Sequence, residues 1–390
     1  MDPSAQTPTV EHMFERQGSL ALDFTPSDSA ETMLANVIHA PYRAISLYSG
    51  AGGLDLGFTR ENIEIRWAID HDQFAVQTYN TNLEPYACCG DVLEVDPPAG
   101  LRPDIVIGGP PCQGFSVIGR MDPEDPRSKH VDHFFDVVEH LEPRAFVMEN
   151  VKALAASPRW ADIRKRLLDR AESLGYERDL FVLNAADYNV PQTRERMFLV
   201  GLVGGMPEQP IATTAGSPPT VRSVLEKLPR YGEPGNDAGC SARVIPASRP
   251  VMRPTAYRGS LLFNGSGRPL LLDGHAKTLP ASMGGNATPI IDQDEFEHGA
   301  EPWVIGYHRR LLRGNPPLRR APDRLRRITV QEAAALQSFP LGWEFAGPRV
   351  AQYRQVGNAV PPNLAQAVAQ SVRRALERLD SAEPSEALAA

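Results

Sequence analysis

Short apolar runs that alternate with helical patterns constrain the fold of this chain more than any other feature. Six runs of five or six residues, most of them rich in Val, Ile, Leu or Phe, are typical of buried strands. They are AISLYS (44–49), RWAID (66–70), DIVIGG (104–109), AFVMEN (145–150), DLFVLN (179–184) and MFLVGL (197–202). The clearest helix between them has one apolar stripe before Gly175, made of Trp160, Ile163, Leu167, Leu168, Ala171 and Leu174. The alternation predicts an α/β domain with a mainly parallel sheet.

The alternation stops between residues 204 and 322, which are rich in Gly, Pro and Arg. This change predicts a second, loop-rich domain. Helical periodicity returns at 329–337, and a last helix has an apolar face of Leu364, Val368, Val372, Leu376 and Leu379. Residues 1–42 carry six acids against Arg16 and predict a disordered arm with a helical turn around 30–39. We expect a flexible tail at 381–390.

Composition limits the other classes of protein. The four cysteines form no C-x-x-C pair, which disfavours structural zinc and a disulfide framework. No apolar run approaches 18 residues, and the N-terminus lacks the apolar stretch of a secretory signal. We therefore expect a soluble protein of a reducing compartment, with no metal and no membrane partner.

Positive charge is concentrated in one part of an acidic chain. The net charge is −8, yet residues 241–330 hold 14 Lys and Arg against 7 Asp and Glu. Residues 303–327 alone contain eight arginines and one acid, Asp323. This distribution is typical of a local phosphate-binding face, although a solvated arginine face that binds nothing has the same composition.

A glycine-rich turn follows the first strand, in the segment SGAGGLDLG (49–57). Such a turn lets the backbone approach a ligand at a helix N-terminus, although a simple tight turn is the alternative. The spacing differs from G-x-G-x-x-G, which disfavours a dinucleotide. Asp70 ends the second strand, where a carboxylate can accept from ribose hydroxyls, and Gly90 and Asp91 come before the next run. Together they favour a nucleoside cofactor without pyrophosphate, such as S-adenosylmethionine.

Three further strand ends carry reactive side chains. Cys112 follows the run DIVIGG between two prolines and a Gly-containing loop, which makes it a candidate nucleophile, although a lone cysteine is usually a buried small side chain. Glu149 ends the next run, where apolar surroundings raise a carboxyl pKa; a helix N-cap is the alternative. Arg194 and Arg196 alternate along an extended segment and share a face, unless they lie on a surface strand. We assign Cys88, Cys89 and Cys240 to packing.

Six blocks in this order resemble the DNA cytosine-5 methyltransferases of prokaryotic type. They are SLYSGAGGLDLGF, GGPPCQGFS, MENV, PQTRER, RRITVQEAAALQSFP and QVGNAVPPN, and they extend over residues 43–202 and 326–379. The resemblance implies a Rossmann-like sheet that binds S-adenosylmethionine, with a smaller, loop-rich target-recognition domain inserted. The catalytic and cofactor-binding domain is then 43–202 and 346–380, and the recognition domain is 203–345.

The resemblance also implies the reaction. Cys112 adds to C6 of a cytosine so that C5 can accept the methyl group, Glu149 bonds N3 and the exocyclic amine, and Arg196 holds O2. Arg194 supports the side of Cys112. Because the target atom is inaccessible inside a duplex, the base must be flipped out. Charge moved onto the ring requires a donor near N3, and nearby arginines favour the thiolate.

The remaining implied sites concern the cofactor and DNA. Asp70 takes the ribose, and His71 lies against the adenine, where the family often has an aromatic residue; Leu is more usual in the family at the position of His130. The full implied cofactor set is Tyr48, Gly50, Gly52, Gly53, Asp70, His71, Asp91, Pro111, Asn358 and Ala359. The expected DNA contacts are Gln113, Ser116, Arg309, Arg310, Arg313, Arg319 and Arg320. Thr278 and Leu279 resemble a Thr-Leu element seen in many recognition domains.

These features predict a monomeric enzyme that methylates double-stranded DNA in the prokaryotic cytoplasm, alone or beside a restriction endonuclease of the same specificity. Three alternatives remain. A transfer-RNA cytosine-5 methyltransferase shares the fold, but the Cys-Phe-Thr element typical of that group is missing. A catalytically silent DNA-binding relative is disfavoured by intact Cys112, Glu149 and Arg196. A dinucleotide oxidoreductase is disfavoured by the glycine spacing.

Overall fold

The computed structural model describes residues 42–111, 129–214, 216 and 218–382. Within them, one seven-stranded sheet has the order β3-β2-β1-β4-β5-β8-β6. Its strands are β1 (Tyr42–Leu47), β2 (Ile63–Asp70), β3 (Ala87–Cys89), β4 (Ile105–Gly108), β5 (Ala145–Val151), β6 (Glu177–Asn184) and β8 (Glu195–Leu202). All six apolar runs are strands, and the predicted α/β fold is confirmed.

The sheet is mainly parallel, as predicted, with one exception. Neighbours from β3 to β5 pair in parallel, whereas β8 is antiparallel to both β5 and β6. The sequence missed β3, because three residues are too few to show a strand pattern. Asp91 therefore follows a strand of its own, two residues after β3 ends.

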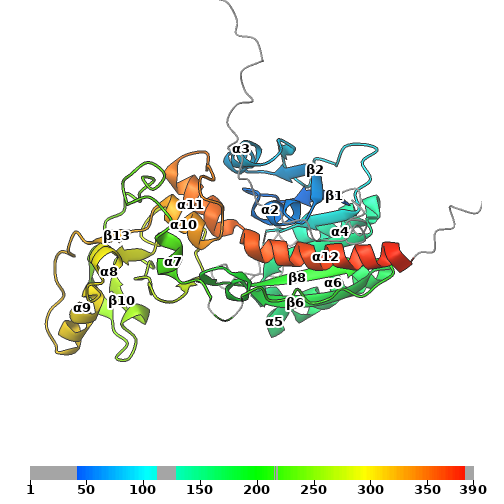
Figure 1. The fold of residues 1–390 in the computed structure, drawn as a ribbon. Coiled ribbons are helices and arrows are strands. Elements are labelled where there is room, and N and C mark those ends of the chain that lie inside the picture. Colours follow the sequence, from blue (N-terminus) through cyan, green and yellow to red (C-terminus); the bar gives the residue numbers. More distant parts are fainter. Residues whose placement is uncertain (1–41, 112–128, 215, 217, 383–390) are drawn as a thin grey trace, which may run out of the picture. The chain divides into compact units, whose positions relative to one another are not determined.

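Helices cover both faces of the sheet (Figure 1). Successive residues of β1 show the division: Ala44 packs into one core with α2 and α12, whereas Ile45 and Leu47 pack into the other with α4. On the first face lie α2 (Gly53–Thr59), α3 (Gln73–Asn82) and α12 (Pro362–Ala382). On the second lie α4 (Lys129–Leu141), α5 (Lys152–Ala156) and α6 (Ala161–Ser173). The final helix of the chain thus returns beside the first helix after the Gly-rich turn.

Two predicted helix ends can be compared with the structure. Helix α6 ends at Ser173, and Gly175 follows with φ +85°, which confirms it as the stop. Helix α12 runs to Ala382, and its last turn is tied to the sheet because Asp380 accepts from Tyr42 Oη and pairs with Arg144. Of the predicted arm at 1–42, residues 1–41 lie outside the described residues, and Tyr42 begins β1. Of the predicted tail at 381–390, residues 383–390 lie outside them, and Ser381 and Ala382 belong to α12.

Short helices and strands lie between β8 and α12. They are α7 (Val221–Leu225), β9 (Pro246–Val251), η4 (Tyr257–Gly259), β10 (Leu261–Phe263), β11 (Ala276–Lys277), β12 (Ile290–Asp292), α8 (Gln293–His298), α9 (Trp303–Leu312), β13 (Leu325–Arg327), α10 (Val330–Leu336) and α11 (Arg349–Asn358). They enclose two further cores. One is centred on α7, α10 and α11, and the other packs β10 against α9. No helix of the described part is long and apolar enough to cross a membrane.

A buried carboxyl group supports the start of the fold. Asp55 on α2 is fully buried and accepts from Ser46 Oγ on β1 and from Tyr79 Oη on α3, both at 3.0 Å. Burial raises the pKa of Asp55 to about 6, and these two hydrogen bonds oppose the rise. The native state therefore holds a proton that the unfolded chain releases near pH 4.

This difference predicts a pH-dependent stability. Since the native state binds more protons between pH 4 and pH 6, the free energy of unfolding falls as the pH rises through that window. In urea titrations, Asp55→Asn should lack the part of this fall due to Asp55, about 2 kcal/mol between pH 4.5 and 7.5. The two hydroxyls can rotate to satisfy an amide. A constant difference between wild type and variant across this range would show that Asp55 does not titrate.

Candidate active site

The predicted reactive residues lie where parallel strands end. Asp70 ends β2, Pro111 follows β4 by three residues, and Glu149 lies near the end of β5. Carboxyl ends of parallel strands meet at one edge of a sheet, where such folds bind ligands. Cys112, Gln113 and Ser116 lie outside the described residues, and Pro111 is the last residue described before them.

The Gly-rich turn is bonded to the end of β2. Gly50 has φ +55°, and its N–H donates to Asp70 Oδ2 at 2.9 Å. A Cβ added at Gly50 would meet nothing within 4 Å, so the space in front of this turn is open. Gly52 caps α2 with φ +83°. Gly53 has another role, because a Cβ there would lie 2.4 Å from Val360 O and 3.2 Å from Ala359 Cβ.

Asp70 is held as an acceptor. Its Oδ1 accepts from Asp72 N at 2.8 Å, and burial raises its pKa against the effect of its backbone donors. The two oxygens retain lone pairs for further donors, as binding of ribose hydroxyls requires. His71 is largely exposed and lies 3.4 Å from Asp70. The carboxylate of Asp70 and the Gly-rich turn therefore border one open space. A ligand there could donate to the carboxylate and lie close to the backbone of the turn.

Tyr48 links this turn to the start of α4. Its hydroxyl lies 3.2 Å from both Nδ1 and the carbonyl oxygen of His130, and the rings pack edge to face. Burial and the nearby Asp91 raise the pKa of Tyr48, so the phenol stays protonated. Burial lowers the pKa of His130. Tyr48, Asp91 and His130 thus form one wall beside the turn.

A buried ion pair joins Glu149 to Arg196. Arg196 Nε lies 2.9 Å from Glu149 Oε1, and both side chains are at most 15% exposed. The pair exists because β8 runs antiparallel to β5 and places Arg196 opposite Val151. Burial raises the pKa of Glu149, as expected, and the positive charges of Arg196 and Arg194 oppose the rise. The site thus holds a carboxyl group that can accept or donate a proton beside a fixed positive charge.

The neighbouring Asn150 does not cap a helix, which was the alternative that the sequence left open. Its Nδ2 donates to Pro110 O at 3.2 Å, so it holds the segment that leads to Cys112. Helix α5 is capped by Val151 without a side-chain bond, and the N-cap alternative for Glu149 and Asn150 is wrong. The sequence missed this role, although Asn150 lies within the block MENV.

Arg194 is fully buried, and the surface-strand alternative is wrong for it. Nη1 donates to Leu279 O at 3.1 Å, and Nη2 donates to Gly357 O at 2.9 Å and Ala359 O at 3.0 Å. We call these contacts of Arg194 with Leu279, Gly357 and Ala359 the buried joint, and two glutamines extend it. Gln192 accepts from Leu279 N and donates to Leu336 O, and Gln337 donates to Ala359 O. The sequence missed both glutamines, although PQTRER and ALQSFP contain them.

Backbone pairing strengthens the same joint. Strand β7 (Gln192–Thr193) pairs in parallel with β11, and Thr278 Oγ1 donates to Thr193 O at 2.9 Å. The Thr-Leu element is therefore bonded to β7, and Arg194 lies between β7 and β8, the strand that carries Arg196. Asn358, at the exposed end of α11, follows Gly357 in the same joint.

The predicted DNA-binding arginines differ in whether a carboxylate already pairs with them. Arg309 pairs with Glu301 at 3.2 Å and Arg320 with Asp323 at 2.8 Å. Arg310 lies 3.5 Å from Pro316 O. Arg313 and Arg319 are exposed and have no carboxylate within 4 Å in the part of the chain that is described. Free positive charge in this cluster is thus concentrated on two residues.

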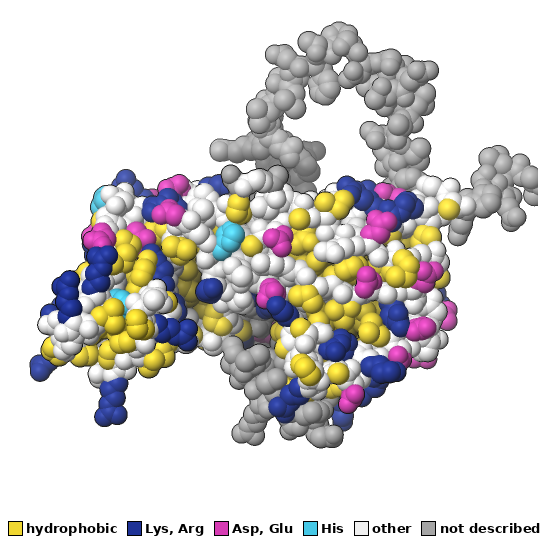
Figure 2. Space-filling model, turned by 90° about the horizontal axis from the view of Figure 1, so that it is seen from below, with side chains coloured by type: hydrophobic (Ala, Val, Ile, Leu, Met, Phe, Trp, Pro, Cys, Tyr) yellow, Lys and Arg dark blue, Asp and Glu magenta, His cyan; other side chains and the backbone are white. Residues whose placement is uncertain are grey.

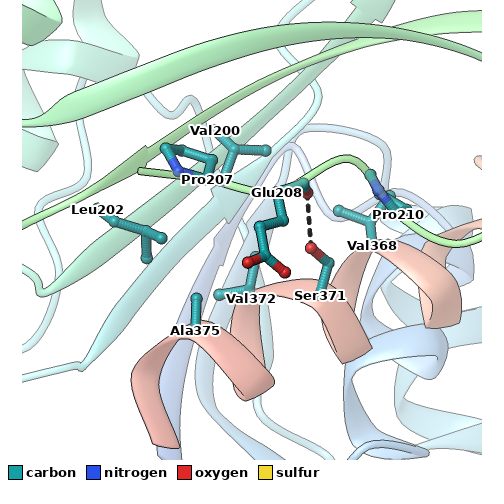
Figure 3. A pocket seen from close by; sticks show the side chains of 9 residues that line it. All are labelled: Val200, Leu202, Pro207, Glu208, Pro210, Val368, Ser371, Val372 and Ala375. Carbon is teal, nitrogen blue, oxygen red and sulfur yellow. Dashed lines mark hydrogen bonds between the residues drawn. The ribbon is translucent and has the colours of Figure 1, made fainter. Parts of the chain in front are cut away.

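The other cysteines do not lie at this edge as a group. Cys88 and Cys240 are partly buried, whereas Cys89 is exposed, so assigning Cys89 to packing was wrong. A hollow beside α12 is equally separate from the site (Figure 3). It lies where residues 207–210 cross α12, Ser371 Oγ donates to Glu208 O there, and its lining contains none of the predicted site residues. No cluster of three or more metal-ligating side chains occurs among the described residues.

Comparisons with known proteins first show which class of protein shares the fold of this chain and then the family to which the chain belongs. Solved structures with the same fold include the Dnmt2 methyltransferase of S. pombe (TM-score 0.58, 20% identity, 87% of this chain and 99% of that one) and the methyltransferase EhMeth of Entamoeba histolytica (TM-score 0.61, 16% identity, 87% and 99%). The chain therefore has the same fold as these methyltransferases. The family of C-5 cytosine-specific DNA methylases matches residues 42–374.

Two relatives agree with this match. The Type II methyltransferase M.XorII of Xanthomonas oryzae pv. oryzae is 33% identical over 88% of this chain and 87% of its own. M1.HphI of Haemophilus parahaemolyticus is 33% identical over 84% and 86%. The chain therefore belongs to the C-5 cytosine-specific DNA methylases. It is an enzyme that methylates cytosine in DNA, with S-adenosylmethionine as the methyl donor.

The ion pair predicts the effect of Glu149→Gln. The amide keeps the shape and a hydrogen bond but loses the proton chemistry, so single-turnover methyl transfer should slow on the order of 10²-fold or more. Binding of S-adenosylmethionine, measured by calorimetry, should change little. Glu195→Gln is the matched control, because Glu195 is exposed and pairs with Lys152. A near-wild-type rate for Glu149→Gln would reduce Glu149 to a structural residue.

Proposed function

We propose that this enzyme methylates C5 of a flipped-out cytosine in a specific duplex sequence through a covalent bond between Cys112 and C6. The observation that carries this proposal is the buried pair of Glu149 and Arg196 beside the segment leading to Cys112. C5 is a poor nucleophile until C6 carries a substituent, and the pair supplies the donors that the substituted ring needs.

Named residues account for every step except removal of the C5 proton. The Cys112 thiolate adds to C6, which breaks the C5–C6 π bond and leaves its electron pair at C5, and C5 then attacks the methyl carbon. S-adenosylmethionine, when bound, would supply that methyl group, with S-adenosylhomocysteine as the leaving group. A base removes the proton from C5, the C5–C6 double bond re-forms, and the thiolate is expelled. Glu149 holds N3 and the exocyclic amine, and Arg196 holds O2 and keeps Glu149 oriented through their 2.9 Å contact.

Arg194 serves the reaction as a positioning residue. Its guanidinium is bonded to three carbonyls, and its charge acts at Glu149 through space. It thus fixes the strand that delivers Arg196 while adding positive potential on the side of Cys112.

The residues beside the Gly-rich turn fit S-adenosylmethionine. The open space at Gly50 admits a ligand against the backbone, and Asp70 keeps acceptor capacity for ribose hydroxyls. We assign Tyr48, His71 and Asp91 to the adenosine side. Gly52, Gly53, Pro111, Asn358 and Ala359 complete the predicted cofactor set.

We assign residues 203–345 to target recognition, and 43–202 with 346–380 to catalysis and cofactor binding. Gln113 and Ser116 are placed at the DNA by their nearness to Cys112 in sequence. The names of both relatives contain the term Type II methyltransferase, which supports a role beside a restriction endonuclease. The protein is proposed to act as a monomer on DNA in the prokaryotic cytoplasm.

One assay separates this proposal from its rivals. Labelled methyl groups should pass from S-adenosylmethionine to duplex DNA and not to transfer RNA, and bisulfite sequencing of an expressing host should then identify the target sequence. Transfer to transfer RNA alone would support the first rival. Duplex binding without transfer would support the silent relative.

The nucleophile has a direct test. Cys112→Ser should abolish methyl transfer, because a hydroxyl near neutral pH is far less nucleophilic than a thiolate, while DNA binding should persist. Cys240→Ser serves as the control. Duplex DNA with 5-fluorocytosine at the target should trap the wild type, since fluorine cannot leave C5 as a proton does. Mass spectrometry should place the adduct on Cys112, and an adduct on Cys88, Cys89 or Cys240 would contradict the assignment.

The recognition arginines have a salt-dependent signature. Replacing Arg313 and Arg319 with Ala should weaken binding to cognate and scrambled duplexes alike and lower the slope of log affinity against log salt by about 0.9 per lost contact. Affinity for S-adenosylmethionine should not change. The double variant Lys165→Ala/Arg166→Ala removes the same charge from surface ion pairs on α6 and should keep the wild-type slope. A slope equal to that control would identify the cluster as a solvated face.

A further inference from the structure

One part of the inserted region combines positive charge with a lack of acids. Residues 241–270 contain five arginines and no Asp, Glu or Lys. They form the antiparallel hairpin of β9 and β10, in which Leu261 pairs with Val251. Leu262 and Phe263 anchor the hairpin in the core below α9. The stretch is thus a fixed surface element with a net charge of +5.

Four of these five arginines lack an acidic partner. Arg258 pairs with Glu295 at 3.0 Å. No carboxylate of the described residues lies within 4 Å of the others, Arg243, Arg249, Arg253 and Arg268. Several acids elsewhere in the inserted region are already paired, as in Arg222 with Asp273 and Arg326 with Glu332. Most of the arginines in this hairpin region thus keep their positive charge unpaired.

Two of the unpaired arginines are held in place. Arg268 is partly buried, and its Nη1 lies 3.3 Å from the carbonyls of Gly265 and Gly267. Arg253 has an exposed side chain on an anchored backbone, because its N–H donates to Ser260 Oγ at 2.8 Å and its carbonyl contacts His308 Nε2 at 2.9 Å. Burial lowers the pKa of Arg268, and the positive charge of Arg253 adds to this effect.

A third guanidinium lies under the same turn. Arg327 is 3% exposed, and it donates to Thr288 O at 2.6 Å and to Asn264 Oδ1 at 3.1 Å. Burial lowers its pKa, and it has no ion-pair partner among the described residues. In Figure 2, Lys and Arg side chains project from the end of the molecule that carries α9 and β10 in Figure 1.

We propose that the four unpaired arginines of this hairpin region, Arg243, Arg249, Arg253 and Arg268, bind phosphodiester groups of the DNA substrate. The inference rests on the proposed function of residues 203–345. Guanidinium forks match phosphate oxygens, and phosphate contacts fix the register of a protein on a duplex without reading bases. This site differs from the cluster of arginines at 309–320, in which Arg309 and Arg320 already pair with acids.

The test is the salt dependence of binding by Arg253→Ala/Arg268→Ala. The slope of log affinity against log salt should fall by about 0.9 for each lost contact. At 0.15 M salt, the affinity should then fall roughly 5-fold if one contact is lost and roughly 30-fold if both are lost. Cognate and scrambled duplexes should be affected alike. Single-turnover methyl transfer at saturating DNA, and binding of S-adenosylmethionine, should stay at wild-type levels. The control is again Lys165→Ala/Arg166→Ala.

A second variant keeps the test informative if the first one folds poorly. Arg253→Lys/Arg268→Lys retains both charges and the aliphatic stems but loses the planar forks, so it should keep most of the slope and lose part of the affinity. In the Ala variant, a slope change no larger than that of the control would overturn the site. In the Lys variant, an affinity equal to that of the wild type would overturn it.

Two further outcomes separate the sources of the anion and the levels of the proposal. Stabilisation of the wild type by inorganic phosphate over chloride at equal ionic strength, lost in the Ala variant without any change in the DNA slope, would assign the pair to a small anion and overturn the inference. A wild type that binds duplexes with the expected slope but methylates none would contradict the proposed function and leave this site supported.

Discussion

The buried guanidinium of Arg194 holds together three stretches of chain that are far apart in sequence. Its hydrogen bonds end on Leu279, Gly357 and Ala359, and it lies directly before β8, the strand that carries Arg196. Leu279 and Gly357 are buried, so loss of the donor to either carbonyl would cost about 1–3 kcal/mol, whereas Ala359 O also accepts from Gln337 Nε2. The catalytic strand, the Thr-Leu element and the end of α11 are therefore fixed relative to one another by one side chain, with Gln192 and Gln337 completing the bonds.

The chemistry depends on the single antiparallel strand of the sheet. Because β8 runs against β5, Arg196 arrives opposite Val151 and reaches Glu149 within 2.9 Å. A carboxyl group buried alone in this position would favour the neutral form, and the arginines oppose that tendency without cancelling it. The result is a group with a proton to share beside a positive charge, which the proposed attack at C6 of cytosine requires.

In the inserted region, the positive charge that remains available for a partner depends on which arginines pair with acids, and not on how many arginines there are. The sequence interpretation singled out residues 303–327 because they contain eight arginines, yet Arg309, Arg320, Arg324 and Arg326 all have acidic partners in the folded chain. Residues 241–270 contain fewer arginines, but most of these face no carboxylate among the described residues. A count of acids in short windows would have indicated this hairpin. Only the pairing shows which charges remain for a partner.

The sequence by itself determined the class of fold and the chemistry-bearing blocks. Apolar runs, the Gly-rich turn and the positions of Asp70 and Glu149 at strand ends depend on local patterns that survive without contacts. Tertiary structure decided the rest. The three-residue strand β3 forms only because β2 offers its edge, and Arg194 proved to be a buried joint because carbonyls from positions 279, 357 and 359 converge on it. Such partners lie 85 to 165 residues away in the chain, and no local pattern records them.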